Sequence, residues 1–237
     1  MFKAGVASVN ELTKGLATIG HYLASLALPP VCCLCASRGA RERLDLCEYC
    51  RESLPGNLAP DDYPPIFTRA VVPFSYAYPV DHCIRALKFK GERVYARVFG
   101  ALLADARSKL DAPLPDLVVP VPLHDSRYRE RGFNQAREIA RFAARHLGIP
   151  VASQLLIRTA KTREQSGLPL AERVSNVRGA FALRSPSKTH VASALNSVAL
   201  VDDVLTTGST ASEAAHALQA SGAKQIELWA IARVNLD

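Results

Sequence analysis

Several common features are absent from this chain. No apolar stretch is long enough to cross a membrane, since the run from Tyr22 to Leu28 is too short, so we expect no integral membrane segment. The N-terminus lacks the basic start, apolar core and cleavage site of a signal peptide, which predicts a cytoplasmic protein. Neither G-x-x-x-x-G-K-[ST] nor G-x-G-x-x-G occurs, which argues against P-loop and dinucleotide-binding proteins. Aromatic residues are only 7% and do not visibly alternate with the basic runs, so a base-stacking platform is unsupported.

The composition that remains is that of a folded, basic protein. Of 237 residues, 49% are hydrophobic, which suffices for a packed core, and 22% are charged. The formal net charge is +7, which favours contact with phosphates on small molecules or on nucleic acid. Charge alone does not separate these two ligand classes.

The pattern along the chain divides it into three parts. Residues 1–30 predict short amphipathic helices that end at Pro29 and Pro30, residues 31–54 hold most of the cysteines, and a proline-rich linker precedes a domain at 66–237. In that domain strands alternate with helices, which predicts an α/β fold with a mostly parallel sheet and ligands at the carboxyl ends of its strands. The expected strands are 70–74, 117–122, 198–201 and 226–231, and the expected helices are 81–87, 94–109, 134–146 and 209–221.

The most informative stretch runs from Val198 to Thr210. Four apolar residues predict a short buried strand, and the acidic pair Asp202 and Asp203 follows it. A turn then opens a helix and offers hydroxyls and backbone N–H groups to an anion, through Thr206, Thr207, Gly208, Ser209 and Thr210. The carboxylates can accept hydrogen bonds from vicinal sugar hydroxyls, so a ribose 5-phosphate would satisfy both parts. The alternative, a polar turn with a helix cap, explains the loop but not the adjacent acids.

Two basic segments add candidates for the same ligand. The connection after Val121, Pro122 and Leu123 carries Arg127 and Arg131, whose guanidinium groups suit a pyrophosphate, unless they form only a solvated basic face. A later polar run has the composition of a flexible lid over a phosphate-rich ligand or of an ordinary exposed loop. Its candidate residues are Arg158, Lys161 and Gln165.

Five of the six cysteines fall between residues 32 and 50. Cys32-x2-Cys35 and Cys47-x2-Cys50 form two chelating pairs, which suit a tetrahedral structural Zn²⁺ in a reducing compartment. Cys33 is interpreted as a neighbour of this site, because a Cys33-x-Cys35 pair would give a tighter bite. A redox dithiol pair or simple buried thiols are the alternatives.

Together these motifs resemble a known family. The stretch from Val201 to Thr210 resembles the phosphoribosyl pyrophosphate (PRPP) motif of type I phosphoribosyltransferases, and the chain as a whole is similar to the ComF family of competence proteins (ComFC type). The resemblance runs from about residue 31 to the C-terminus and also rests on Cys-x2-Cys pairs, Leu87–Gly91, Pro120–Leu123, Arg131–Gln135, Gln165–Leu168, Glu172-Arg173 and Asn176-Val177.

The resemblance implies specific roles. Asp202 and Asp203 would hold the ribose hydroxyls, residues 206–210 the 5-phosphate, and the loop at 121–123 the pyrophosphate, with Arg127 as a helper. Mg²⁺ would bridge pyrophosphate and ribose oxygens, and the chemistry would be displacement of pyrophosphate at the anomeric carbon. The family also implies a link to DNA uptake in natural transformation. Two functions follow: a phosphoribosyltransferase of unknown acceptor, or a non-catalytic, zinc-containing factor that handles single-stranded DNA or contacts the DNA-uptake machinery and retains a PRPP site.

Overall fold

The computed structural model describes residues 31–38, 44–57, 61–159, 179–184 and 196–234. The chain divides into two compact units, residues 1–52 and 53–237. The N-terminal helical segment expected at 1–30 lies outside the described residues. In the first unit the described chain contains the short helix α2 (Glu48–Glu52) and a bridge between Val31 and Arg38.

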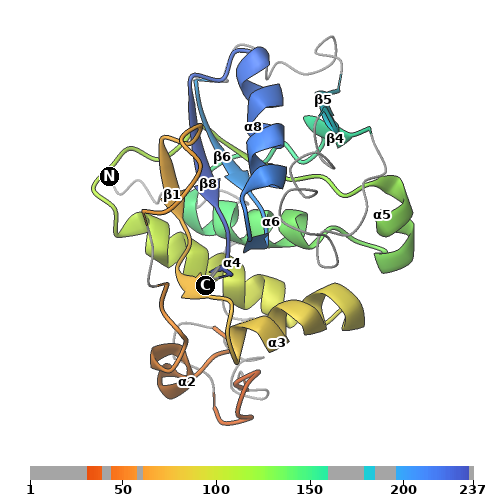
Figure 1. Cartoon of the computed structure of the whole chain (residues 1–237). Coiled ribbons are helices and arrows are strands. Elements are labelled where there is room, and N and C mark those ends of the chain that lie inside the picture. Colours follow the sequence, from red (N-terminus) through yellow and green to blue (C-terminus); the bar gives the residue numbers. More distant parts are fainter. Residues whose placement is uncertain (1–30, 39–43, 58–60, 160–178, 185–195, 235–237) are drawn as a thin grey trace, which may run out of the picture. The chain divides into compact units, whose positions relative to one another are not determined.

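A four-stranded parallel sheet forms the centre of the second unit (Figure 1). Its strand order is β1-β8-β6-β3. The strands are β1 (Arg69–Val71), β8 (Gln225–Trp229), β6 (Ser197–Val201) and β3 (Leu117–Pro120). All four residues of β3 and the last four residues of both β6 and β8 are buried, as expected for parallel strands covered on both faces. The predicted fold class, α/β with a mostly parallel sheet, is confirmed.

Two smaller sheets complete the second unit. One is parallel, with β2 (Phe74–Ser75), β9 (Ala232–Arg233) and β7 (Val204–Leu205) in the order β2-β9-β7. The other is an antiparallel pair, β4 (Leu156–Arg158) and β5 (Phe181–Leu183). This pair lies where the sequence suggested only loop, because strands of three residues are too short to show an alternating pattern.

Helices cover both faces of the main sheet. Helix α8 (Ser209–Ala220) shares one core cluster with Leu117, Val119, Val198 and Leu200 of the central strands. Helices α4 (Val94–Ser108) and α6 (Gln135–Leu147) cover the other face, where Arg107 of α4 donates a hydrogen bond to Glu227 of β8. The two faces are distinct because side chains alternate along a strand.

Helices α4 and α6 pack closely against each other. A Cβ atom on Gly100 of α4 would lie 2.5 Å from Cβ of Phe142 on α6, so only glycine fits at this contact. The predicted apolar stripe on α6 is buried, and the helix ends at Gly148 in the left-handed conformation, with φ 72°. Its buried members are Ala136, Ile139, Ala140 and Ala143.

Three elements differ from those that the sequence predicted. The strand expected at 70–74 is split between β1 and β2, since Pro73 has no N–H for a sheet. The helix expected at 81–87 is α3 (Val80–Arg85), which continues as a π-helical turn, η1 (Ala86–Lys90). The basic connection at 123–135 contains a short helix, α5 (Asp125–Arg131), which ends at Gly132 with φ 74°.

No helix in the described ranges has both the length and the apolarity that a membrane crossing requires.

Candidate functional site

A pocket of about 550 Å³ lies where β3 and β6 end. It brings together most of the predicted site residues, in agreement with the rule that parallel sheets bind ligands at the carboxyl ends of their strands. The predicted residues that line it are Asp202, Asp203, Thr206, Gly208, Thr210, Val121, Pro122, Leu123, Arg127, Arg131 and Arg158. The predicted lid residues Lys161 and Gln165 lie outside the described residues.

Thr207 and Ser209 do not line the pocket. Their hydroxyl oxygens lie 2.9 Å apart, and the Ser209 N–H donates to Thr207 Oγ1 at 3.3 Å. These contacts join the two residues within the turn before α8. The turn itself requires Gly208, which has φ 74° and whose Cβ would lie 2.5 Å from Cγ of Pro64.

The acidic pair is held by the backbone of neighbouring strands. The Asp202 N–H donates to the Trp229 carbonyl at 2.8 Å, and the Asp203 carbonyl accepts from the Ile231 N–H at 3.1 Å. The Asp203 N–H donates to Asp202 Oδ1 at 2.8 Å. The position of both carboxylates thus follows from the ends of β6 and β8 and needs no flexible loop.

The two carboxylates differ in their surroundings. Asp203 is only 5% exposed, and its Oδ1 lies 2.8 Å from Lys88 Nζ. Its Oδ2 is buried and has no hydrogen-bond partner in the described part of the chain. Burial, and then the charge of Asp203, raises the pKa of Asp202 to about 7, against the opposing effects of the Asp203 N–H, Lys88 and Arg158.

The pocket is lined by five cationic and only two acidic side chains. Arg85 and Lys88 come from α3 and η1, Arg127 and Arg131 from α5, and Arg158 from β4. Burial, and then the nearby positive charge of Arg127, lowers the pKa of Arg158. The two guanidinium groups are therefore close enough to repel each other. The excess of positive charge suits a ligand with several phosphates.

Sequence reasoning missed several residues of this pocket. Lys88 sits on the π-helical turn, a rare element that is frequent at functional sites. Phe89 is 67% exposed, and the Arg131 guanidinium lies 5.1 Å from the centre of its ring. Asn134 Nδ2 donates to the Val121 carbonyl at 2.9 Å and so ties α6 to the loop after β3. The segment Leu87–Gly91 is one of the motifs on which the family resemblance rests. Nothing in its spacing, however, predicted that Lys88 forms an ion pair with Asp203.

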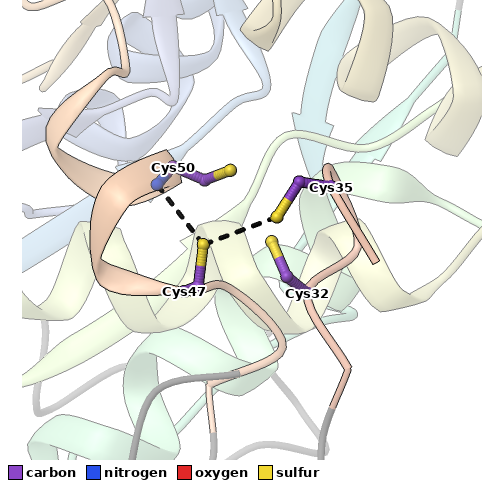
Figure 2. A group of neighbouring side chains, drawn as sticks. All are labelled: Cys32, Cys35, Cys47 and Cys50. Carbon is purple, nitrogen blue, oxygen red and sulfur yellow. Dashed lines mark hydrogen bonds between the residues drawn. The ribbon is translucent and has the colours of Figure 1, made fainter. Parts of the chain in front are cut away.

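In the first unit, Cys32, Cys35, Cys47 and Cys50 form a cluster (Figure 2). Their sulfur atoms all lie within 4.8 Å of one another, and Cys35 Sγ lies 3.6 Å from Cys47 Sγ. Four sulfurs around a tetrahedral zinc are about 3.8 Å apart, given Zn–S bonds of about 2.3 Å. The group therefore fits a metal ion, and Cys33 is not a member of it.

Local contacts favour thiolates at two of these cysteines. A hydrogen bond from the Ser37 hydroxyl, followed by one from the Ser37 backbone, lowers the pKa of Cys35 to about 6. The Cys50 N–H, 3.5 Å from Cys47 Sγ, lowers the pKa of Cys47, whereas burial raises that of Cys50. Metal ligation by cysteine uses the thiolate, so the cluster is chemically suited to a cation.

Comparison with known proteins identifies relatives of this chain by sequence. No protein-family model matches the chain. DNA utilization protein YhgH of Salmonella typhi is 34% identical over 212 residues, which cover 86% of this chain and 90% of that protein. Competence protein F of Haemophilus influenzae is 34% identical over 173 residues, covering 71% and 74%. Competence protein ComFC of Bacillus subtilis is 28% identical over 152 residues, covering 63% and 57%.

Similar solved structures include those of an amidotransferase and of a phosphoribosyltransferase. Glutamine PRPP amidotransferase from B. subtilis has a TM-score of 0.36 at 21% identity, covering 57% of this chain and 25% of that one. Adenine phosphoribosyltransferase from Leishmania tarentolae has a TM-score of 0.35 at 20% identity, covering 60% and 58%. Family membership rests instead on the sequence relatives, two of which match at 34% identity over most of both chains. The chain therefore belongs to the ComF family, together with DNA utilization protein YhgH and Competence protein F.

Proposed function

We propose that the pocket binds PRPP together with Mg²⁺ and that the protein transfers or senses a phosphoribosyl group. Asp202 and Asp203 accept hydrogen bonds from the ribose hydroxyls, and the turn at 206–210 holds the 5-phosphate at the start of α8. The loop at 121–123, with Arg127 and Arg131, holds the pyrophosphate. The geometry supports this assignment because all three parts border one cavity.

One observation carries the proposal: Asp203 is buried, yet its Oδ2 has no partner among the described residues. A buried polar atom without a partner costs about 1–3 kcal/mol, more when it is charged. A ligand hydroxyl that donates to Oδ2 would remove this cost. A sugar supplies such hydroxyl groups, and the surrounding cations suit the phosphates of a sugar phosphate.

The residues also suit the chemistry of transfer. In the reaction the bond from the anomeric carbon to pyrophosphate breaks, a bond to the acceptor forms, and the acceptor loses a proton. Arg127 and Arg131 would stabilise the negative charge that develops on the departing pyrophosphate, and the two carboxylates would orient the ribose. When bound, Mg²⁺ supplies further charge neutralisation to the phosphate oxygens.

For the cysteine cluster we propose a structural zinc ion. All four positions are filled by sulfur, which leaves no open site for a substrate and is typical of a structural centre. Metal analysis of the purified protein should find about one zinc per chain, and Cys47→Ser should lower that content. A metal-free protein with four reduced thiols would contradict the assignment.

The names of two relatives refer to DNA utilization and competence, which supports a role with DNA. We propose that the protein acts in DNA uptake or utilization, in the cytoplasm. The second candidate is a non-catalytic factor that handles single-stranded DNA and keeps the PRPP site, which the +7 net charge favours. A screen for pyrophosphate release over candidate acceptors separates the two, because only the transferase releases pyrophosphate.

Calorimetric titration with PRPP and Mg²⁺ tests the proposal. The wild type should bind, and the double variant Asp202→Asn with Asp203→Asn should lose binding by at least about 100-fold, since both sugar acceptors are weakened. The matched control is Asp105→Asn with Asp111→Asn, which removes two carboxylates outside the pocket and should bind as the wild type does. No heat of binding with the wild type would overturn the proposal.

A further inference from the structure

Helix α6 carries a second positively charged hollow, which the PRPP pocket does not include. It has a volume of about 400 Å³ and lies between the exposed face of α6 and the segment that follows this helix. We define the arginine groove by its lining residues: Arg137, Arg141, Phe142, Arg145, Ile149, Val151 and Ser153. Three of these are cationic and none is acidic.

The spacing of the three arginines follows from the helix. Arg137, Arg141 and Arg145 are four residues apart, so they lie on one face of α6 with about 6 Å of axial rise between neighbours. Like charges at this spacing destabilise an isolated helix. The arrangement is therefore unfavourable by itself and becomes favourable when a row of negative charges lies along the groove.

Little in the described chain neutralises this row. Arg141 Nη1 donates to Glu138 Oε2 at 3.2 Å, and this is an exposed pair of the kind that contributes little. The Nε atom of Arg137 is buried and has no hydrogen-bond partner in the described residues. A phosphate oxygen is the acceptor that a guanidinium group binds best, often with two parallel hydrogen bonds.

The opposite wall of the groove is the edge of the main sheet. Val151 pairs with Val118 of β3 through a parallel bridge, so the chain at 149–153 extends the sheet by one short segment. Phe142 is half-buried and also lines the hollow. An aromatic ring beside a row of cations is the combination that binds a single nucleic-acid strand, with phosphates on the arginines and a base on the ring.

We propose that the arginine groove binds the backbone of single-stranded nucleic acid, with Arg137, Arg141 and Arg145 on successive phosphates and Phe142 against an unstacked base. A duplex keeps its bases stacked inside and cannot place one on Phe142. The inference rests on the proposed role with DNA and assigns that role to a surface separate from the PRPP pocket. Both hollows use α6, which contributes Gln135 and Ala136 to the pocket and Arg137 to the groove.

Fluorescence anisotropy with a labelled oligothymidine tests this surface on the full chain. The triple variant Arg137→Gln, Arg141→Gln, Arg145→Gln should bind on the order of 100-fold more weakly at low salt, because three phosphate contacts are lost. Its slope of log affinity against log salt should fall by about 2, at roughly 0.7 per phosphate. Phe142→Leu should weaken binding roughly 5- to 150-fold while leaving the salt slope unchanged.

The matched control removes three positive charges at exposed positions outside the groove, with Arg97→Gln, Lys109→Gln and Lys224→Gln. It should keep the wild-type slope. A control that loses as much affinity as the triple variant would reduce the effect to net charge and overturn the proposal. So would a triple variant that binds the strand normally, or arginine-dependent binding of polyglutamate but not of the strand.

PRPP titration of the same variants keeps the two proposals apart. The triple variant should bind PRPP as the wild type does, since none of its three residues lines the pocket. Asp203→Asn should lose PRPP binding but should still bind the oligothymidine. Failure of strand binding with intact PRPP binding therefore rejects the arginine groove alone, and the reverse result rejects only the PRPP site.

Discussion

Two buried carboxylates, Glu227 on β8 and Asp203 just after β6, differ in how fully the protein satisfies them. Glu227 accepts four hydrogen bonds, two from Arg107 at 2.8 and 3.0 Å, one from Arg69 at 3.0 Å and one from the Trp229 indole at 2.8 Å. Asp203 has the Lys88 ammonium at Oδ1 and a buried Oδ2 without a partner in the described chain. Both are about equally buried: 5% of the side-chain surface is exposed for Glu227 and 7% for Asp203.

This difference supports our proposal that Asp203 binds a ligand, whereas Glu227 is structural. Arg107 is fully buried, and its remaining donors reach the carbonyls of Ala112 and Pro113. The Glu227 network thus closes on itself and joins α4 to the sheet. The Asp203 site is open on one side, toward the cavity. A buried oxygen without a partner calls for an explanation, and at Asp203 the ligand that we propose supplies one.

The largest expected effect is at the closed network. Glu227→Gln removes the charge that compensates the buried Arg107, so the free energy of unfolding should fall by about 3–5 kcal/mol. Urea denaturation measures this loss. Glu92→Gln, at an exposed position, should change the unfolding free energy by less than about 0.5 kcal/mol. A fully stable Glu227→Gln protein would remove the distinction between the two acids.

The next prediction compares the loss of stability when one cationic partner is removed from each acid, Lys88 from Asp203 and Arg69 from Glu227. Lys88→Met takes away the ion pair of Asp203 and should lower the unfolding free energy by about 2–3 kcal/mol. Arg69→Met leaves Glu227 with three hydrogen bonds, and since Arg69 is 38% exposed, the loss should be about 0–1 kcal/mol. Chemical denaturation of both variants checks the order, and an equal or reversed loss would contradict it.

The third effect is a pH dependence centred on Asp202, which changes stability less per pH unit than the losses expected at Glu227 and Lys88. Its pKa in the folded protein is raised to about 7, above the ordinary value near 4. The folded state therefore holds the proton more tightly than the unfolded state, and this contribution to stability is lost as pH rises from about 4 through about 7. The slope is at most about 1.4 kcal/mol per pH unit.

Asp202→Asn should flatten that part of the stability curve, which urea midpoints at several pH values would show. PRPP binding should strengthen above pH 7, where Asp202 is ionised and can accept from hydroxyl groups. An unchanged stability profile in the variant would place the titration on another group.

The parts of the site that were predictable from the sequence are those that are local in the chain. Asp202, Asp203 and Gly208 share one strand-to-helix turn, and the cysteine pairs carry their spacing in the sequence. The α/β class followed from the alternation of strands and helices. Such features depend on neighbours within a few residues, so their pattern can be recognised before folding is known.

The contacts that escaped prediction join distant segments. Lys88 meets Asp203 across more than a hundred residues, and Arg107 lies 120 residues from Glu227. Neither pair has a spacing to recognise. The arginine groove is an intermediate case: Arg137, Arg141 and Arg145 have helical spacing that a search for charged faces would find, but their shared hollow with Val151 depends on the edge of the sheet.

The most direct test of Asp203 as a reserved ligand group is the change in thermal midpoint on addition of PRPP and Mg²⁺. At about 100 times the dissociation constant, ligand binding stabilises a protein by about 2.7 kcal/mol, or roughly 5 to 10 °C for a chain of this size. We predict this rise for the wild type and for Arg69→Met, and no rise for Asp203→Asn. An equal rise in Asp203→Asn, or none in the wild type, would contradict the assignment.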